Sequence, residues 1–150
     1  MIEVEISRGL KTRLAPGLLE RAARSTLRQQ SVPNADLSLV LAGDARLRTL
    51  NRKYLDKDAP TDVLSFPSLE TDPETGRRYL GDVVISLPRA EHQARVGGHS
   101  LEHEVQLLVV HGVLHLLGHD HARPQDRDRM WTDQAEILKG LGVSPAIVHE

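Results

Sequence analysis

The chain of 150 residues contains no cysteine. Disulfide bonds and thiolate metal sites are therefore excluded, and a metal would have to be bound by histidine or carboxylate side chains. Aromatic residues are also scarce, with one Trp, two Tyr and one Phe, which argues against a broad base-stacking surface. No apolar run approaches the roughly 20 residues that span a bilayer, and the first residues lack the apolar core of a signal peptide. We therefore expect a cytoplasmic protein without a membrane partner.

Charge is distributed unevenly along the chain. The net charge is −2, yet residues 1–60 hold eleven Lys or Arg against seven Asp or Glu, and residues 61–150 hold eight against fourteen. Within the basic half, Arg21, Arg24 and Arg28 recur at three- and four-residue steps, which places them along one face of a helix. Such a stripe is either the solvated face of an amphipathic helix or a surface that contacts the phosphates of a nucleic acid.

The hydrophobic pattern predicts one domain formed by residues 1–150, since 39% of the residues are hydrophobic and suffice for a core. Periodicities of two predict strands, and helical periodicities predict helices between and after them. The order indicates an α+β fold in which a small mixed four-stranded sheet is covered by helices. The predicted strands are 2–6, 37–41, 63–66 and 82–86, and the predicted helices are 16–30, 44–54, 88–96, 100–117 and 124–141.

The most informative segment runs from His111 to His121 and reads HGVLHLLGHDH. His111 and His115 are four residues apart, so on a helix their imidazoles lie about 40° apart around the axis and one turn from each other. Leucines and valines surround them on almost every side, as in a buried helix. Gly118 can adopt the left-handed conformation that ends a helix, so that His121 or His119 can approach the pair. Three neutral histidines around an open position are typical ligands of a catalytic zinc ion.

The spacing of this segment also matches that of the metzincin peptidases, whose motif is H-E-x-x-H-x-x-G-x-x-H. In those enzymes the glutamate after the first histidine is the general base. This chain has Gly112 at that position, and glycine can neither accept a proton nor orient water. Asp120, Glu102 and Glu104 are the nearby carboxylates, and Asp120 is better placed to orient a histidine ligand. A peptidase is therefore the weaker interpretation.

Three blocks of the sequence resemble the YbeY family of bacterial zinc-dependent endoribonucleases, which act in ribosomal RNA maturation. The segment from His111 to His121 is similar to the family signature H-G-x-L-H-L-x-G-[aromatic or His]-D-H. A second block comprises residues 51–54 (NRKY) and residues 58–67 (DAPTDVLSFP), and a third comprises residues 80–86 (LGDVVIS). The three blocks have the order expected for the family and span about half of the chain.

The resemblance implies a zincin-like fold whose central helix binds one Zn2+ per chain through His111, His115 and His121. His119 occupies a position where the family often has an aromatic residue, which implies a place at the rim of the site. The implied substrate is single-stranded RNA, in particular the 3′ region of small-subunit ribosomal RNA. The implied partners are the small ribosomal subunit and its assembly factors, and the implied roles are ribosomal RNA processing and ribosome quality control.

The chain departs from the family at Leu55, where members usually have an arginine directly after the tyrosine. Arg52 or Lys57 could place a positive charge in the same cleft, although each is also compatible with an ordinary surface position. Arg52, Lys57, Arg21, Arg24 and Arg28 are thus the candidate RNA contacts. The missing arginine keeps open a second interpretation, a non-catalytic ribosome-assembly factor that zinc stabilises.

Overall fold

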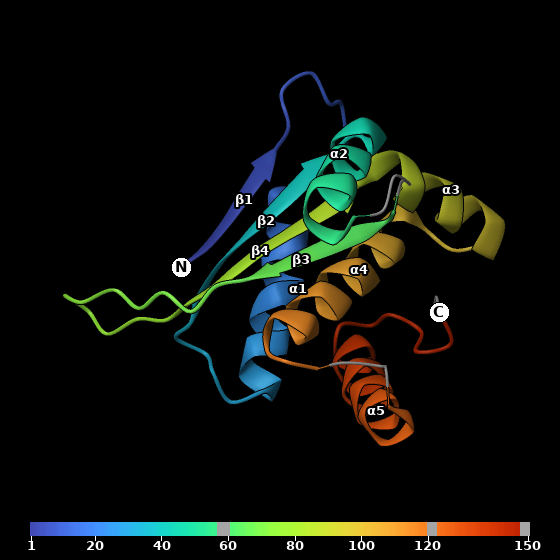
Figure 1. The fold of residues 1–150 in the computed structure, drawn as a ribbon. Helices are drawn as coiled ribbons and strands as arrows, with labels where there is room; N and C mark the ends of the chain where they lie inside the picture. Colours follow the sequence, from blue (N-terminus) through green and yellow to red (C-terminus); the bar gives the residue numbers. More distant parts are fainter. Residues whose placement is uncertain (57–60, 120–122, 148–150) are drawn as a thin grey trace.

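The computed structural model describes residues 1–56, 61–119 and 123–147 (Figure 1). Four strands and five helices occur in this part of the chain, in the order that the sequence predicts. The expected fold class, an α+β fold with a mixed four-stranded sheet, is confirmed. The strands are β1 (Ile2–Ile6), β2 (Asp36–Ala42), β3 (Val63–Pro67) and β4 (Tyr79–Ser86), and the helices are α1 (Pro16–Gln29), α2 (Asp44–Leu55), α3 (Leu87–Gly97), α4 (Leu101–Leu116) and α5 (Pro124–Gly140).

The sheet has the strand order β1-β2-β4-β3. Strands β1, β2 and β4 are parallel, whereas β3 runs antiparallel to β4 and forms one edge of the sheet. Beyond Pro67 the two strands continue as a ribbon that projects from the body, to the left in Figure 1. Arg77 in this ribbon forms an ion pair with Asp36 at the start of β2, at 2.6 Å, and this contact lowers the pKa of Asp36 to about 2.

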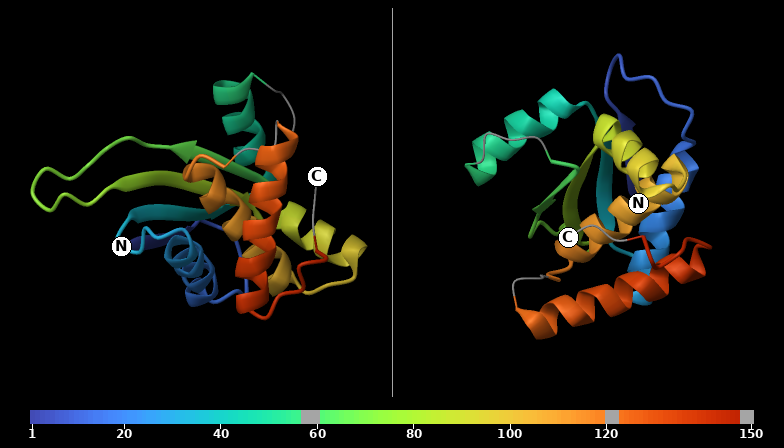
Figure 2. Two further views of the ribbon diagram at one scale, coloured as in Figure 1. Left: turned by 90° about the horizontal axis from the view of Figure 1, so that it is seen from below. Right: turned by 90° about the vertical axis from the view of Figure 1, so that its right-hand side faces the viewer.

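Helices cover both faces of the sheet (Figure 2). Helices α1 and α4 lie side by side on one face, while α2 packs against β3 and β4 on the other face. Helix α5 packs against α4 and α1, and α3 contacts α4 and β4. None of the helices in the described part of the chain is long and apolar enough to cross a membrane.

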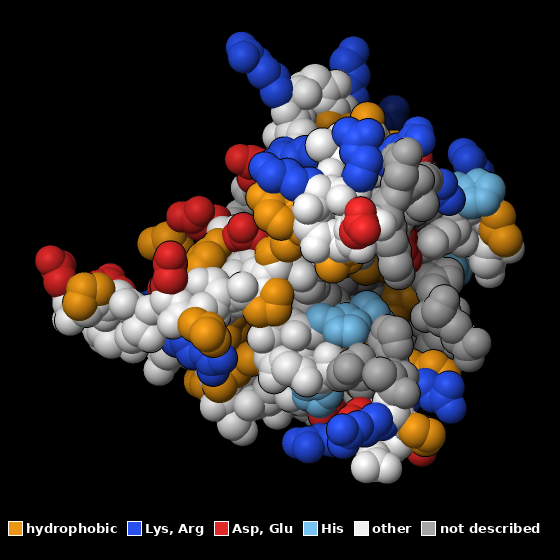
Figure 3. All heavy atoms as spheres, viewed as in Figure 1, with side chains coloured by type: hydrophobic (Ala, Val, Ile, Leu, Met, Phe, Trp, Pro, Cys, Tyr) orange, Lys and Arg blue, Asp and Glu red, His pale blue; other side chains and the backbone are white. Residues whose placement is uncertain are grey.

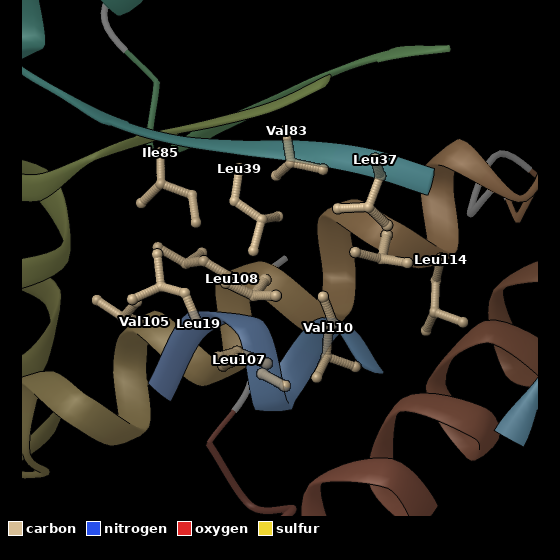
Figure 4. Packing of buried hydrophobic residues seen from close by; sticks show 14 of the residues in the cluster. Leu19, Leu37, Leu39, Val83, Ile85, Val105, Leu107, Leu108, Val110 and Leu114 are labelled. Carbon is tan, nitrogen blue, oxygen red and sulfur yellow. The ribbon is translucent and has the colours of Figure 1, made fainter. Parts of the chain in front are cut away.

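Side chains of β2 alternate between two hydrophobic clusters, because successive residues of a strand point to opposite faces. Leu37 and Leu39 pack with Leu108 of α4 and with α1, as Figure 4 shows. Val40 joins the smaller cluster under α2, which includes Leu47. Each fully buried leucine contributes roughly 1.5–3 kcal/mol to folding, so the larger cluster is what holds α4 in place.

Helix α4 is buried on nearly all sides, as its uninterrupted apolar sequence predicts. It begins at a Ser100 cap, whose hydroxyl accepts a hydrogen bond from the His103 backbone N–H at 3.1 Å. It ends before Gly118, which has a φ of 94°. Strand β4 differs from the prediction, since it begins at Tyr79 and not at Asp82. Its first residues also pair with β2, and the register of this pairing shifts between Asp36 and Ser38. The start of β4 therefore lacks the regular two-residue alternation by which a strand is predicted.

Candidate metal centre

His111 and His115 lie side by side on the last turns of α4. Both residues are half-buried, and their Nε2 atoms are 3.1 Å apart with the rings inclined by 71°. Two nitrogens that each lie about 2.0–2.1 Å from one tetrahedral zinc ion are roughly 3.3–3.4 Å apart. Histidine side chains are visible in a hollow of the surface in Figure 3, between the α2 side and the α5 side. The separation in the pair is thus close to the one that a shared metal ion requires.

Gln134 of α5 determines which nitrogen of His111 carries the proton. Its Oε1 lies 2.9 Å from Nδ1 of His111, and an amide oxygen can only accept a hydrogen bond. In the neutral ring Nδ1 therefore donates, and the lone pair is on Nε2, the nitrogen that faces His115. Gln134 is 3% exposed, so little water competes for this contact. Sequence reasoning did not identify Gln134, because a glutamine on an amphipathic helix gives no signal of its role.

His119 lies apart from this pair, after the end of α4. Its Nε2 is 2.7 Å from Oε1 of Gln30, at the end of α1, and 3.8 Å from a carboxylate oxygen of Asp133. Burial lowers the pKa of His119, and this effect outweighs the opposite effect of Asp133. The ring of His119 thus lies between the end of α1 and α5 and contacts a residue of each. The place at the rim of the site that the resemblance implies for His119 stays a prediction.

The third predicted ligand, His121, lies outside the described residues, as does Asp120. Within residues 1–56, 61–119 and 123–147, no group of three His, Cys, Asp or Glu side chains is arranged to bind a metal ion. The described site therefore consists of the pair His111 and His115, and its third ligand remains a prediction.

Gly112, between the two histidines, lies directly against the sheet. A Cβ atom at this position would be 2.5 Å from Cγ1 of Val83 and 3.3 Å from Oγ of Ser65. The Ser65 hydroxyl donates a hydrogen bond to the Gly112 carbonyl at 2.9 Å. This packing has no room for even a methyl group, and a glutamate, as in the peptidase motif, would not fit. The absence of the peptidase base is thus built into the contact between α4 and the sheet.

Glu104 is also unsuited to act as a base, although the sequence places it on the same helix as the histidine pair. It is fully buried, accepts a hydrogen bond from Nε2 of Gln93 at 2.8 Å, and lies 2.5 Å from Nε2 of His99. Gln93 also donates to Asp62 at 3.3 Å, next to the first residue of β3. These contacts form a part-buried polar network around Glu104 that joins α3, α4 and the beginning of β3.

The candidate RNA contacts lie on two different sides of the molecule. Arg21, Arg24 and Arg28 are exposed on α1, where Arg24 pairs with Glu20 at 2.6 Å. Arg52 is exposed on α2, which covers the opposite face of the sheet, and Lys and Arg side chains gather over α2 in Figure 3. Lys57 lies outside the described residues. The fold therefore does not bring the α1 arginines and Arg52 together.

The sequence matches known proteins over most of its length. The family model described as Endoribonuclease YbeY matches residues 3–142. The chain belongs to the YbeY endoribonuclease family. An Endoribonuclease YbeY from Pelotomaculum thermopropionicum is 48% identical over 132 residues, which cover 85% of this chain and 87% of that protein. An Endoribonuclease YbeY from Roseiflexus sp. is 45% identical, and the match covers 85% of this chain and 84% of that protein.

The fold also has a solved counterpart. A solution structure of the protein TM1509 from Thermotoga maritima has a TM-score of 0.60 and 23% identity, covering 95% of this chain and 92% of that chain. At this identity the likeness supports the fold alone. The expected enzyme class, an endoribonuclease, is confirmed by membership of the YbeY family.

We predict that Gly112→Ala lowers the free energy of unfolding by about 1–2 kcal/mol. Alanine is up to about 1 kcal/mol better than glycine in a helix, but overpacking a core costs about 1–3 kcal/mol. Val83 is fully buried and its β-branched side chain moves little, so the unfavourable effect dominates. Urea unfolding of the metal-free protein measures the change. Gly17→Ala is the control, because a Cβ there meets nothing within 4 Å; equal stability of Gly112→Ala and the wild type would contradict the packing argument.

Proposed function

We propose that residues 1–150 form one domain that cleaves single-stranded RNA with one zinc ion bound by His111, His115 and His121. The observation that carries this proposal is the 3.1 Å separation of the His111 and His115 Nε2 atoms. Gly112, which lies between the two histidines in the sequence, packs closely on Val83. The donor set fits zinc, since imidazole nitrogens are common zinc ligands and the chain has no cysteine. The bond from Nδ1 of His111 to Gln134 leaves Nε2 of the neutral ring able to coordinate a metal ion.

A zinc ion held there would supply Lewis acidity toward a phosphodiester oxygen and lower the pKa of water toward about 7. The chain's own residues supply the positioning. Gln134 orients His111, and Gly112 holds the segment that carries both histidines against the sheet. No carboxylate follows His111, so peptide hydrolysis of the metzincin type lacks its base.

Ribosomal RNA, in particular the 3′ region of the small-subunit RNA, is the substrate that the family resemblance supports. We propose that the chain acts in the cytoplasm on this RNA during maturation and quality control, with the small ribosomal subunit and its assembly factors as partners. The net positive first 60 residues support an approach of RNA from that half of the chain. A specific observation favours the alternative, a zinc-stabilised assembly factor without cleavage. Leu55, in place of the family arginine, is 53% exposed at the end of α2 and supplies no charge.

We expect His121→Ala to lose zinc and RNA cleavage together, whereas His119→Ala keeps zinc because its ring bonds Gln30. Elemental analysis of both variants gives the zinc content, and incubation with single-stranded RNA, double-stranded RNA and casein gives the activity. Zinc that survives the loss of His121 but not of His119 would show that the third ligand is misassigned. A wild type that binds zinc and leaves all three substrates intact would favour the assembly factor.

Gln134→Leu should weaken zinc binding by about 10- to 100-fold, the range for loss of a group that orients a metal-binding histidine. Gln134→Glu keeps an acceptor for Nδ1 of His111 and should bind zinc at least tenfold more tightly than Gln134→Leu. Competition with a chromophoric chelator measures both affinities, and the 15N chemical shifts of the His111 ring report which nitrogen is protonated. Equal zinc affinities of the two variants would show that Gln134 only fills space.

We predict that replacing Arg21, Arg24 and Arg28 together with glutamine weakens RNA binding and flattens its salt dependence. Removal of each arginine that binds a phosphate should reduce the slope by roughly one unit. Arg52→Ala, on the opposite side of the sheet, should lower cleavage by at least about tenfold, or 1.4 kcal/mol of barrier, with a smaller effect on binding. Binding at several salt concentrations and single-turnover cleavage give the two quantities. An unchanged slope would identify the α1 arginines as an ordinary solvated face.

A further inference from the structure

The last turn of α2 carries an exposed aromatic residue. Leu47, Asn51 and Tyr54 follow one another at four- and three-residue steps and so lie along one face of the helix. Leu47 is fully buried and Asn51 is 5% exposed, yet Tyr54 on the same face is 57% exposed. The helix then ends at Asp56, whose left-handed backbone has a φ of 55°. A large aromatic ring is thus presented to solvent at the end of α2.

Phe66 of the edge strand β3 supports the Tyr54 ring from one side. The two ring centroids are 5.3 Å apart and the rings are inclined by 66°, an edge-to-face arrangement. Phe66 is half-buried among the residues under α2, so it anchors the pair. This contact restricts Tyr54 without burying it. Tyr54 therefore differs from a flexible surface tyrosine, since its contact with Phe66 determines the orientation of its ring.

One positive charge lies over the same ring. Nζ of Lys53 lies 5.2 Å from the centroid of the Tyr54 ring. Arg52 is exposed one residue earlier, and the Lys and Arg side chains over α2 form a group in Figure 3. An exposed aromatic ring with one cation at its face and further cations on the same helix can bind an unpaired nucleotide, because the ring stacks on the base and the cations attract the phosphates.

The edge strand also connects this ring to the histidine pair. Ser65 precedes Phe66 and its hydroxyl donates to the carbonyl of Gly112, which lies between His111 and His115. Successive side chains of a strand point to opposite faces, so Phe66 points toward α2 and Ser65 toward α4. An RNA strand that crosses the β3 edge can therefore contact the Tyr54 ring on one side and reach the histidines on the other.

We propose that Tyr54, supported by Phe66 and bordered by Lys53, is a stacking subsite for one unpaired nucleobase of the RNA substrate. This inference rests on the proposed function and adds a residue that recognises the substrate. A base in a duplex is already stacked between its neighbours, so the subsite favours single-stranded RNA. Stacking on tyrosine is also tolerant of sequence, because every base presents a π face.

The test uses the zinc-loaded protein and a short unstructured RNA that carries a fluorescent label. Stopped-flow anisotropy measures affinity before cleavage proceeds. Tyr54→Leu should weaken binding about tenfold, within the range for loss of one base stack, while Tyr54→Phe should change it less than about twofold. Leu69→Ala is the matched control, since Leu69 is 90% exposed in the projecting ribbon and should have no effect.

The same RNA with a single abasic nucleotide, moved along its length, locates the base that stacks. At one position the abasic RNA should bind the wild type about tenfold more weakly, and Tyr54→Leu should then cause no further loss. The subsite would be overturned if Tyr54→Leu bound the intact RNA as tightly as the wild type. It would also be overturned if the loss of affinity from Tyr54→Leu added to the loss from the abasic nucleotide at every position. In either case, cleavage by the wild type would still uphold the proposed function. Failure of the wild type to bind RNA at all would overturn both.

Discussion

The close approach of α4 to the sheet at Gly112 is the constraint on which the site depends. A Cβ atom there would be 2.5 Å from Val83, so the helix backbone is as near to β4 as the packing allows. Ser65 of β3 binds the same peptide unit through its hydroxyl. Since His111 and His115 flank Gly112, the depth of this contact determines how far both imidazoles stand from the sheet. A larger residue would move the helix and both histidines with it.

The polar groups on the buried helix explain why neighbouring helices lie where they do. Burying a carboxylate or an imidazole without a partner is costly. Glu104 is fully buried and bonds Gln93 and His99, which ties α4 to α3 and to the turn between them. His111 bonds Gln134, which ties α4 to α5. Each of these bonds stabilises the fold only when the partner helix is in place, so the arrangement around the histidine pair is specified by polar contacts as well as by hydrophobic packing.

The sequence was most predictive where the information is local. The four-residue spacing of His111 and His115 and the glycine at 118 depend only on helix geometry and on backbone freedom, and the structure has both features. The order of strands and helices was predicted for the same reason. Gln134 was not predicted, because its role depends on a contact with a residue 23 positions away on another helix. Such pairings follow from packing of the whole chain, and no local pattern marks them.

The contact between two aromatic residues was also not predictable from local patterns. The small number of aromatic residues argues against a broad stacking surface, yet it gives no sign that Tyr54 and Phe66 lie together. That contact arises because β3, the edge strand antiparallel to β4, packs against α2. An edge strand has one side without a neighbouring strand, so its two faces meet at an accessible border. The topology therefore places Phe66 on the face of this edge that α2 covers and Ser65 on the face that α4 covers, so the edge strand contacts both the aromatic pair and the histidine helix.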